Sequence, residues 1–218
     1  MIFDETSLIF NAEGRKFQKQ GYYCASPVRS KDFVKYWDDQ KNKCRVGVIY
    51  KDEGKAWYLT RDYYMWLNFL PIFNKEIQKF GFADIRDAQY HMALYECLAE
   101  LNYRHSAILK KRQIASSYFH AGKMINQIWF EEGITLKMGA SLKDYINEKG
   151  TWKFLNEYEA FLNNVSLTKN EDITNAHSNL GMEFSSYDST KFFWNSNIMI
   201  HSKPNYFTSL VMPSVRTG

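Results

Sequence analysis

The sequence predicts a mixed α/β body over residues 1–163, followed by a β-rich tail over residues 164–218. Up to about residue 163, apolar residues at helical spacing alternate with short runs of β-forming residues. Beyond that point Ser, Thr and Asn become frequent and the helical patterns stop. Aromatic residues make up 17% of the chain, which is enough to build a core. We expect an incomplete parallel sheet with flanking helices in the body and a β-hairpin in the tail.

Residues 1–80 are expected to form a helical and hairpin region. Ser30 is typical of an N-cap, and the residues after it predict a helix to about Lys43. Two β-rich runs, Val46–Tyr50 and Ala56–Thr60, flank a loop that contains Gly54 and predict a hairpin. The apolar spacing over Arg61–Leu70 predicts a helix that stops before Pro71.

Residues 81–163 are expected to form a second, partial domain. The longest helical pattern is Asp84–Tyr103, capped by Asp84 or Asp87. Its expected buried face consists of Tyr90, Leu94, Cys97, Leu98 and Leu101. The elements expected after it are a strand at 106–109, a polar loop at 111–116, a helix at 117–131, a strand at 134–138, a short helix at 141–150 and a helix at 152–162.

The tail differs from the body in charge as well as in composition. Residues 164–218 hold four basic and four acidic side chains, so the formal net charge of +4 lies entirely in residues 1–163. Within the tail, Lys191–Ile200 and Tyr206–Val211 are rich in β-forming residues around a turn at Pro204.

Composition excludes several classes of protein. The longest apolar stretch is too short to span a bilayer, and the first residues lack the pattern of a signal peptide, so no membrane partner is expected. Three cysteines without CxxC spacing disfavour a disulfide framework or a zinc site. The net charge of +4 permits a nucleic-acid or phosphate partner.

The segment 109–118, with the sequence LKKRQIASSY, is the strongest candidate for a binding site. It joins a predicted strand to the start of a predicted helix, where free backbone N–H groups and the helix dipole favour an anion. Lys110, Lys111 and Arg112 add positive charge, and a serine there can ligate magnesium or cap the helix. The alternative interpretation is a basic surface loop with a capping serine.

This segment resembles the phosphate loop of the ATPase in large terminase subunits of tailed bacteriophages. Arg112 and Gln113 match the family's Arg-Gln pair, and Ser117 matches its magnesium-binding Ser/Thr. Ala115 stands where the family has glycine, and Ser116 stands where many members have the phosphate-binding lysine. The resemblance covers about residues 10–163, and its aromatic-rich pattern is similar to terminases of crAss-like and other Bacteroides-infecting phages.

The resemblance implies a partial P-loop NTPase-like domain over residues 81–163, with ATP and magnesium as cofactors. Residues 82–95 resemble the family segment whose glutamine contacts adenine, so Gln89 is the candidate for that role. Arg112 would sense or stabilise the γ-phosphate, and Lys110 or Lys111 would replace the missing lysine. The implied partners are double-stranded DNA, a portal and other terminase subunits, during virion assembly in the host cytoplasm.

Four departures from the family bear on catalysis. Alanine carries a conformational cost where glycine adopts a positive φ, and the missing lysine removes charge from the phosphates. The chain also has no hydrophobic strand followed by an acidic pair and no nuclease domain. We therefore expect a terminase fragment that hydrolyses ATP poorly by itself, and whether it is an enzyme stays open.

The tail carries a resemblance of its own. Residues 191–217 resemble the start of the β-domain in chondroitin- and hyaluronate-type polysaccharide lyases. The matching motifs occur in the same order as in that family, at Phe193-Trp194, His201, Pro204–Tyr206 and Ser214–Thr217. Two unrelated resemblances that meet at a composition break favour the hypothesis of a composite frame. The alternative functions are a lyase-related fragment and a non-catalytic nucleic-acid-binding or assembly module.

Overall fold

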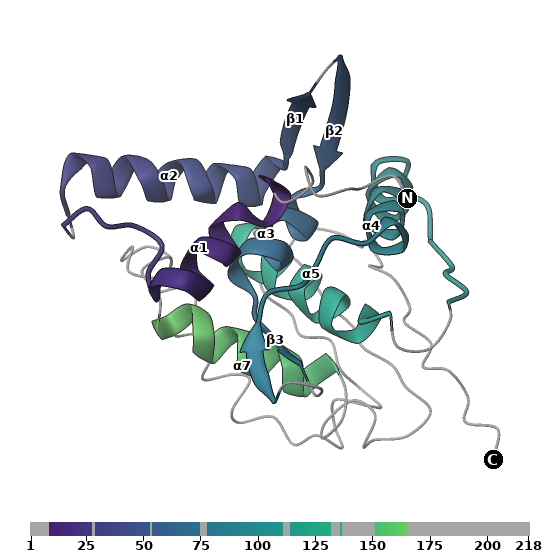
Figure 1. The fold of residues 1–218 in the computed structure, drawn as a ribbon. Helices are drawn as coiled ribbons and strands as arrows, with labels where there is room; N and C mark the ends of the chain where they lie inside the picture. Colours follow the sequence, from purple (N-terminus) through teal and green to yellow (C-terminus); the bar gives the residue numbers. More distant parts are fainter. Residues whose placement is uncertain are drawn as a thin grey trace.

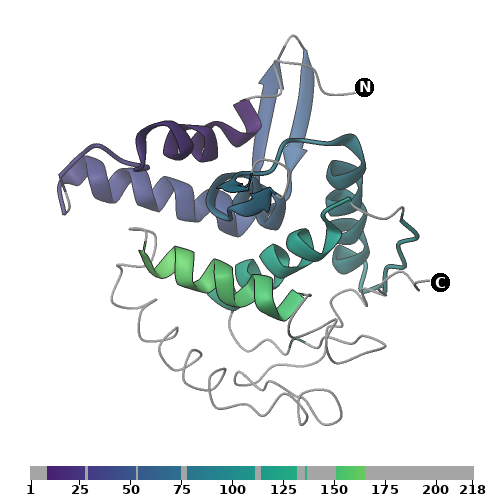
Figure 2. The ribbon, with the colours of Figure 1, turned by 60° about the horizontal axis from the view of Figure 1, so that its bottom comes forward.

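The structure is a computed structural model that describes residues 9–27, 29–52, 54–74, 78–110, 114–131, 136 and 151–164. These residues form a mixed α/β arrangement that is mostly helical, with two small antiparallel sheets (Figures 1 and 2). The coarse fold class is therefore confirmed. A parallel sheet is not found among the described residues.

The first predicted helix and hairpin are confirmed. Helix α2 spans Lys31–Val46, and the Ser30 side chain accepts a hydrogen bond from the Phe33 N–H at its start. Strands β1 (Val48–Asp52) and β2 (Lys55–Leu59) pair antiparallel. Gly47 joins helix to hairpin at φ 80°, where a Cβ would lie 2.5 Å from the Leu59 carbonyl oxygen. Only glycine fits this junction without a shift of the backbone.

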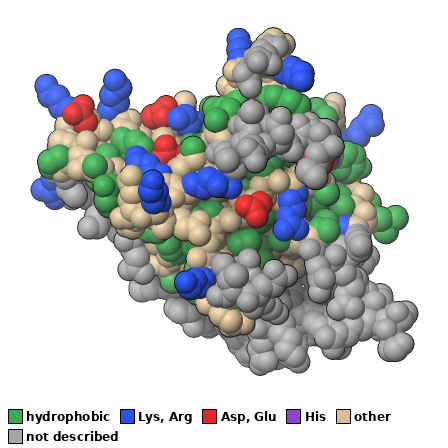
Figure 3. Space-filling view, viewed as in Figure 1, with side chains coloured by type: hydrophobic (Ala, Val, Ile, Leu, Met, Phe, Trp, Pro, Cys, Tyr) green, Lys and Arg blue, Asp and Glu red, His purple; other side chains and the backbone are tan. Residues whose placement is uncertain are grey.

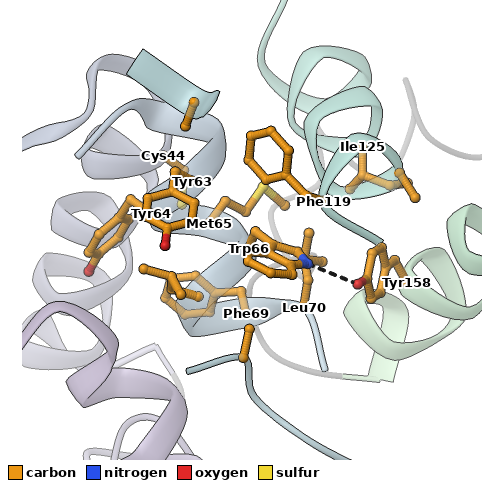
Figure 4. Close-up of a cluster of buried hydrophobic side chains, with 14 of the residues drawn as sticks. Cys44, Tyr63, Tyr64, Met65, Trp66, Phe69, Leu70, Phe119, Ile125 and Tyr158 are labelled. Atoms are coloured by element: carbon orange, nitrogen blue, oxygen red, sulfur yellow. Dashed lines mark hydrogen bonds between the residues drawn. The ribbon is translucent and has the colours of Figure 1, made fainter. Parts of the chain in front are cut away.

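Helix α3 (Arg61–Phe69) is the centre of the core. Every side chain from Asp62 to Phe69 is buried. The Trp66 indole N–H donates to the Tyr158 hydroxyl at 3.1 Å. Figure 4 shows this cluster, in which Phe119 lies beside Tyr63 and Trp66 of α3. The aromatic residues of 63–66 therefore serve as packing residues. Helix α3 contacts α1 (Ala12–Gln20), α2, α4 (Asp87–Leu101) and α5 (Ser116–Phe130), and through Tyr158 it also contacts α7 (Thr151–Asn164).

Helix α1 has no counterpart in the sequence prediction, because its cap comes from elsewhere in the chain. Asn68 of α3 accepts hydrogen bonds from the N–H groups of Glu13 and Gly14 at 3.0 and 3.3 Å. The Asn68 amide also donates to the carbonyl oxygens of Phe10 and Tyr64. One buried side chain thus caps α1 and ties it to α3.

The region after α3 departs from the prediction in two ways. Strands β3 (Ile72–Asn74) and β4 (Lys79–Gly81) form a second hairpin that was not predicted. Helix α4 begins at Asp87, and neither Asp84 nor Asp87 caps it, since Arg86 holds the N-cap position.

The expected buried face of α4 is confirmed only in part. Tyr90 is buried and Leu94 and Cys97 are half-buried, but Leu98 and Leu101 are 58% and 70% exposed. The inward face also carries Gln89, Met92, Ala93 and Glu96. Two of these four side chains are polar because this face makes hydrogen bonds and ion pairs to α5.

The strand expected at 106–109 is also wrong. The segment is irregular, Leu109 is fully exposed, and no described strand lies beside it to supply ladder hydrogen bonds. Helices α5 and α7 confirm the helices expected at 117–131 and 152–162, with α5 starting one residue earlier. The helix expected at 141–150, the tail 165–218 and the strand expected at 134–138, apart from Leu136, lie outside the described residues.

Candidate functional site

The candidate loop leads directly into α5. Ala115 adopts a left-handed conformation with φ 54° and ψ 22° at the N-cap position, and no side chain caps the helix. A left-handed residue is what a glycine at this position of a phosphate loop provides. Lys110 is half-buried, whereas Lys111, Arg112 and Gln113 lie outside the described residues. Ser116 is buried and Ser117 half-buried in the first turn of α5.

Gln89 of α4 lies against this loop. Its side-chain N–H donates to the Ile114 carbonyl oxygen at 2.7 Å. The side chain is only 2% exposed, and its amide oxygen accepts no hydrogen bond from the described residues. A buried acceptor without a donor is costly, so a hydrogen-bond donor from outside the described residues would stabilise this oxygen.

Gln89 and Ala115 line one pocket of about 430 Å³. Its polar lining consists of Asn11, Arg15, Gln18, Asp84, Arg86 and Gln89. Its other lining residues are Trp66, Ile72, Gly81, Phe82, Ala83 and Ala115. The volume lies in the range of small-molecule sites, and the mixture of aromatic walls with two arginines suits a ligand that is part apolar and part anionic.

The two arginines of this pocket differ in their partners. The Arg15 Nε donates to the Asn11 side chain at 2.9 Å, and a second guanidinium nitrogen of Arg15 lies 3.8 Å from Asp84. Arg86 is exposed and forms no ion pair with a described residue. Arg86 is therefore the described cation most available to an anion in this pocket.

A buried charged network lies behind the first turns of α5. Lys123 of α5 contacts two carboxylates of α4, Glu96 at 2.6 Å and Glu100 at 2.7 Å. Glu96 also accepts from His120, whose Nε2 is 2.8 Å away. Arg61 of α3 extends the network through ion pairs to Glu100 and Glu131.

The network separates the pKa values of the two α4 carboxylates. Burial raises the pKa of Glu96, but the hydrogen bond from His120 and the charge of Lys123 bring it down to about 2. Burial dominates at Glu100 and raises its pKa despite Lys123. Burial lowers the pKa of Lys123, but Asp62, Glu96 and Glu100 raise it further, so it ends above its usual range. Glu96 and Lys123 are thus held as an ion pair.

His120 connects this network to the start of α5. Its Nδ1 lies 2.7 Å from the Ser116 carbonyl oxygen and 3.1 Å from the Ser116 hydroxyl. Sequence reasoning missed His120 and Glu96 because they lie 24 positions apart on two helices. The only available signal was a histidine four residues after Ser116 in the predicted helix.

The residues present fit the base of ATP better than they fit its magnesium ion. The unpaired Gln89 oxygen matches a ligand amino group, as on an adenine ring. Magnesium prefers several oxygen ligands, and the Ser117 hydroxyl is the described candidate in the first turn of α5. Glu96 and Glu100 are already held by His120 and Lys123, so neither is available as a metal ligand.

The N-terminal part of the surface is basic. Residues 9–59 hold eleven Lys and Arg against six Asp and Glu. Figure 3 shows Lys and Arg side chains spread over α1, α2 and the tip of the β1–β2 hairpin. The formal net charge of residues 9–59 is therefore +5.

No protein-family model matches the sequence, and no curated protein or solved structure matches it. Among the described residues, no helix is both long and apolar enough to cross a membrane.

Proposed function

We propose that the chain is the nucleotide-binding part of a DNA-packaging motor related to the large terminase subunits of tailed bacteriophages. One observation carries the proposal. Gln89, which stands at the position of the family's adenine-contacting glutamine, and Ala115, which stands where its phosphate loop has a glycine, line the same pocket at the start of α5. The resemblance implies an adenine contact at the first position and the phosphate loop at the second.

In this proposal the adenine ring enters the pocket beside Phe82, and its amino group donates to the free oxygen of Gln89. The phosphates lie at the uncapped start of α5, where backbone N–H groups and the helix dipole favour negative charge. Arg86 supplies positive charge from the pocket, and Lys110, Lys111 and Arg112 supply it from the loop. Ser117 is the proposed magnesium ligand.

Double-stranded DNA is the proposed macromolecular partner, together with a portal and further motor subunits. The excess of basic side chains over residues 9–59 supports a DNA contact, because phosphate neutralisation dominates non-specific DNA affinity. The proposed location of this activity is the cytoplasm of the host cell, during virion assembly.

We expect the chain by itself to hydrolyse ATP far more slowly than about 1 per second, the lower end of ordinary turnover. Glu96 and Glu100 already form ion pairs with Lys123, and the sequence lacks the loop lysine and the acidic pair. Phosphoryl transfer depends on such groups for electrostatic stabilisation and for positioning the water. Steady-state phosphate release measures this, and turnover at or above about 1 per second contradicts the expectation.

Equilibrium binding of a fluorescent, non-hydrolysable magnesium–ATP analogue to the whole chain tests the proposal. The Gln89→Ala variant and the double variant Arg112→Ala, Ser117→Ala are each expected to lose about tenfold or more in affinity, as expected for a buried or charge-assisted hydrogen bond. The matched control is Gln20→Ala, at the exposed end of α1. No binding by the unaltered chain, or equal binding by all four proteins, refutes the proposed function.

A further inference from the structure

Helix α4 holds the start of α5 at two points. The first is the hydrogen bond from Gln89 to the Ile114 carbonyl oxygen at 2.7 Å. The second runs from Glu96 through the ring of His120 to Ser116. The uncapped N–H groups of α5, which we propose as the phosphate site, therefore belong to a segment that α4 holds in place by hydrogen bonds.

Both ring nitrogens of His120 face acceptors. The carboxylate of Glu96 is 2.8 Å from Nε2, and the carbonyl oxygen of Ser116 is 2.7 Å from Nδ1. A doubly protonated ring donates to both of them. In a neutral ring that keeps its proton on Nε2, the Nδ1 lone pair points at the Ser116 carbonyl oxygen, and the two acceptors repel. Such a ring has to turn to the Ser116 hydroxyl at 3.1 Å and release the carbonyl.

Charged groups on α3, α4 and α5 belong to the network that holds the ring. The titratable and charged groups in this network are Glu96 and Glu100 on α4, Lys123 and the Ser116 hydroxyl on α5, and Asp62 on α3, which acts on Lys123. His120 and Lys123 share the carboxylate of Glu96. His120 is 5% exposed, so water does not replace a broken hydrogen bond at the ring.

We propose that His120 is a positioning residue for the anion-accepting end of α5, and that the second proton on its ring controls how tightly this end holds phosphate. The inference rests on the proposed function for its ligand. With the proton in place, the Ser116 carbonyl is held toward His120 and the first turn of α5 is kept in register. Removal of the proton breaks that hydrogen bond and takes away one positive charge near the helix start.

The sign of the pH effect follows from this. Affinity for a phosphate ligand is highest at low pH and falls as the ring gives up its second proton. The phosphate ligand also titrates in this range, so the measured quantity is the affinity of the unaltered chain relative to that of His120→Gln. Glutamine still donates to Glu96 from an amide that does not titrate.

The first experiment measures the affinity of the fluorescent ATP analogue, without magnesium, from about pH 5.5 to 8.5, the range in which a histidine ring ordinarily titrates. The unaltered chain is expected to lose about tenfold in affinity relative to His120→Gln over this range, as for the loss of one charge-assisted hydrogen bond. The control His91→Gln changes an exposed histidine on the outer face of α4 and is expected to follow the unaltered chain. Parallel pH profiles for the unaltered chain and His120→Gln overturn the inference and leave the proposed function intact.

A second measurement uses the unaltered chain alone, so it depends neither on a ligand nor on whether the His120→Gln variant folds. In the unaltered chain, nuclear magnetic resonance follows the His120 ring and the amides of Ser117 and Tyr118 against pH. These amides are expected to shift together with the ring. Amides that stay fixed while the ring titrates, or a ring that keeps one protonation state over the whole range, overturn the inference. Absence of analogue binding at every pH refutes the proposed function, and the amide titration still decides the role of His120.

Discussion

Lys123 is a cation enclosed by protein, with a side chain 3% exposed and two carboxylates within hydrogen-bond distance. A buried ion pair stabilises a protein little more than well-packed apolar residues in the same place would. Removing one partner of the pair is strongly destabilising, because the remaining charge stays buried without a partner. The network therefore fixes how α4 sits against α5 rather than adding much net stability.

At the residue scale we predict that Lys123→Met destabilises the chain by about 3–5 kcal/mol, because Glu96 and Glu100 then lose their shared cation. The matched control is Lys153→Met on α7, an exposed lysine 3.7 Å from Glu157, for which we expect a change within about 0.5 kcal/mol. Urea unfolding monitored by tryptophan fluorescence gives both values. A loss below about 1 kcal/mol for Lys123→Met contradicts a tightly closed network.

The site residues differ in how far the sequence reveals them. A family resemblance selects Gln89 and Ala115, and both of them line one pocket in the structure. Glu96 and His120 give no such signal, since each is an ordinary residue of its own helix and only the packing of α4 on α5 brings them to 2.8 Å. Pairing across helices of this kind leaves no local pattern to detect.

Ala115 lies at the boundary between the loop and helix α5 and adopts a left-handed backbone conformation, which is strained for an alanine. The left-handed conformation of an alanine costs about 1–2 kcal/mol of folding free energy, and glycine removes this cost. Glycine also makes the unfolded chain more flexible, which lowers the stability of the folded state by about 0.4–1 kcal/mol. At the element scale we therefore predict that Ala115→Gly stabilises the chain by roughly 0.5–1 kcal/mol. Ala99→Gly inside α4 is expected to destabilise by about 1 kcal/mol. Thermal unfolding separates the two, and destabilisation by Ala115→Gly argues against the left-handed conformation.

Helix α1 depends on one side chain of another helix. We predict that Asn68→Ala destabilises the chain by about 2–4 kcal/mol, because the buried N–H groups of Glu13 and Gly14 and the carbonyl of Phe10 lose their partner. Limited proteolysis of the folded variant is expected to cut first within α1. The control Asn102→Ala removes an exposed amide at the end of α4 and is expected to leave the proteolysis pattern unchanged. Cleavage of Asn68→Ala that spares α1 contradicts this role.

Prediction of the elements succeeded where the signals were local. Helix α2 carries its own cap at Ser30, and the β1–β2 hairpin carries its own glycine loop. Helix α1 lacks a local cap, and strands β3 and β4 have three residues each, so neither gives a readable pattern. On α4, apolar periodicity indicated only part of the buried face, because that face also carries the polar residues that contact α5 and its leading loop.

At the scale of the whole molecule, alternation of helical and β-rich segments was enough to predict a mixed α/β chain but not how its strands pair. The expected parallel sheet required 106–109 to find a neighbouring strand, and the described strands pair only within their own hairpins. The centre of the described molecule is a helix, α3, around which α1, α2, α4 and α5 pack. Strand pairing is a long-range property, so the local pattern of 106–109 did not determine it.

The charge of the molecule leads to a final prediction. Five more basic than acidic side chains lie in residues 9–59, more than the net +4 of the whole chain. Non-specific binding to duplex DNA is therefore expected, and the logarithm of the affinity should fall linearly with the logarithm of salt concentration. Lys31 and Lys35 are exposed on α2, and neither forms an ion pair with a described residue.

Changing both lysines to glutamine is expected to weaken binding to all duplex sequences alike and to reduce the salt slope by about two, because each lysine neutralises one phosphate. Fluorescence anisotropy with two unrelated duplexes at several salt concentrations measures both effects. The control Lys153→Gln changes an exposed lysine on α7, outside residues 9–59, and is expected to keep the slope of the unaltered chain. An unchanged slope in the double variant would show that α2 is not part of the DNA interface. Attraction to the phosphates is strongest at low salt, so absence of binding by the unaltered chain at low salt would exclude DNA as a partner.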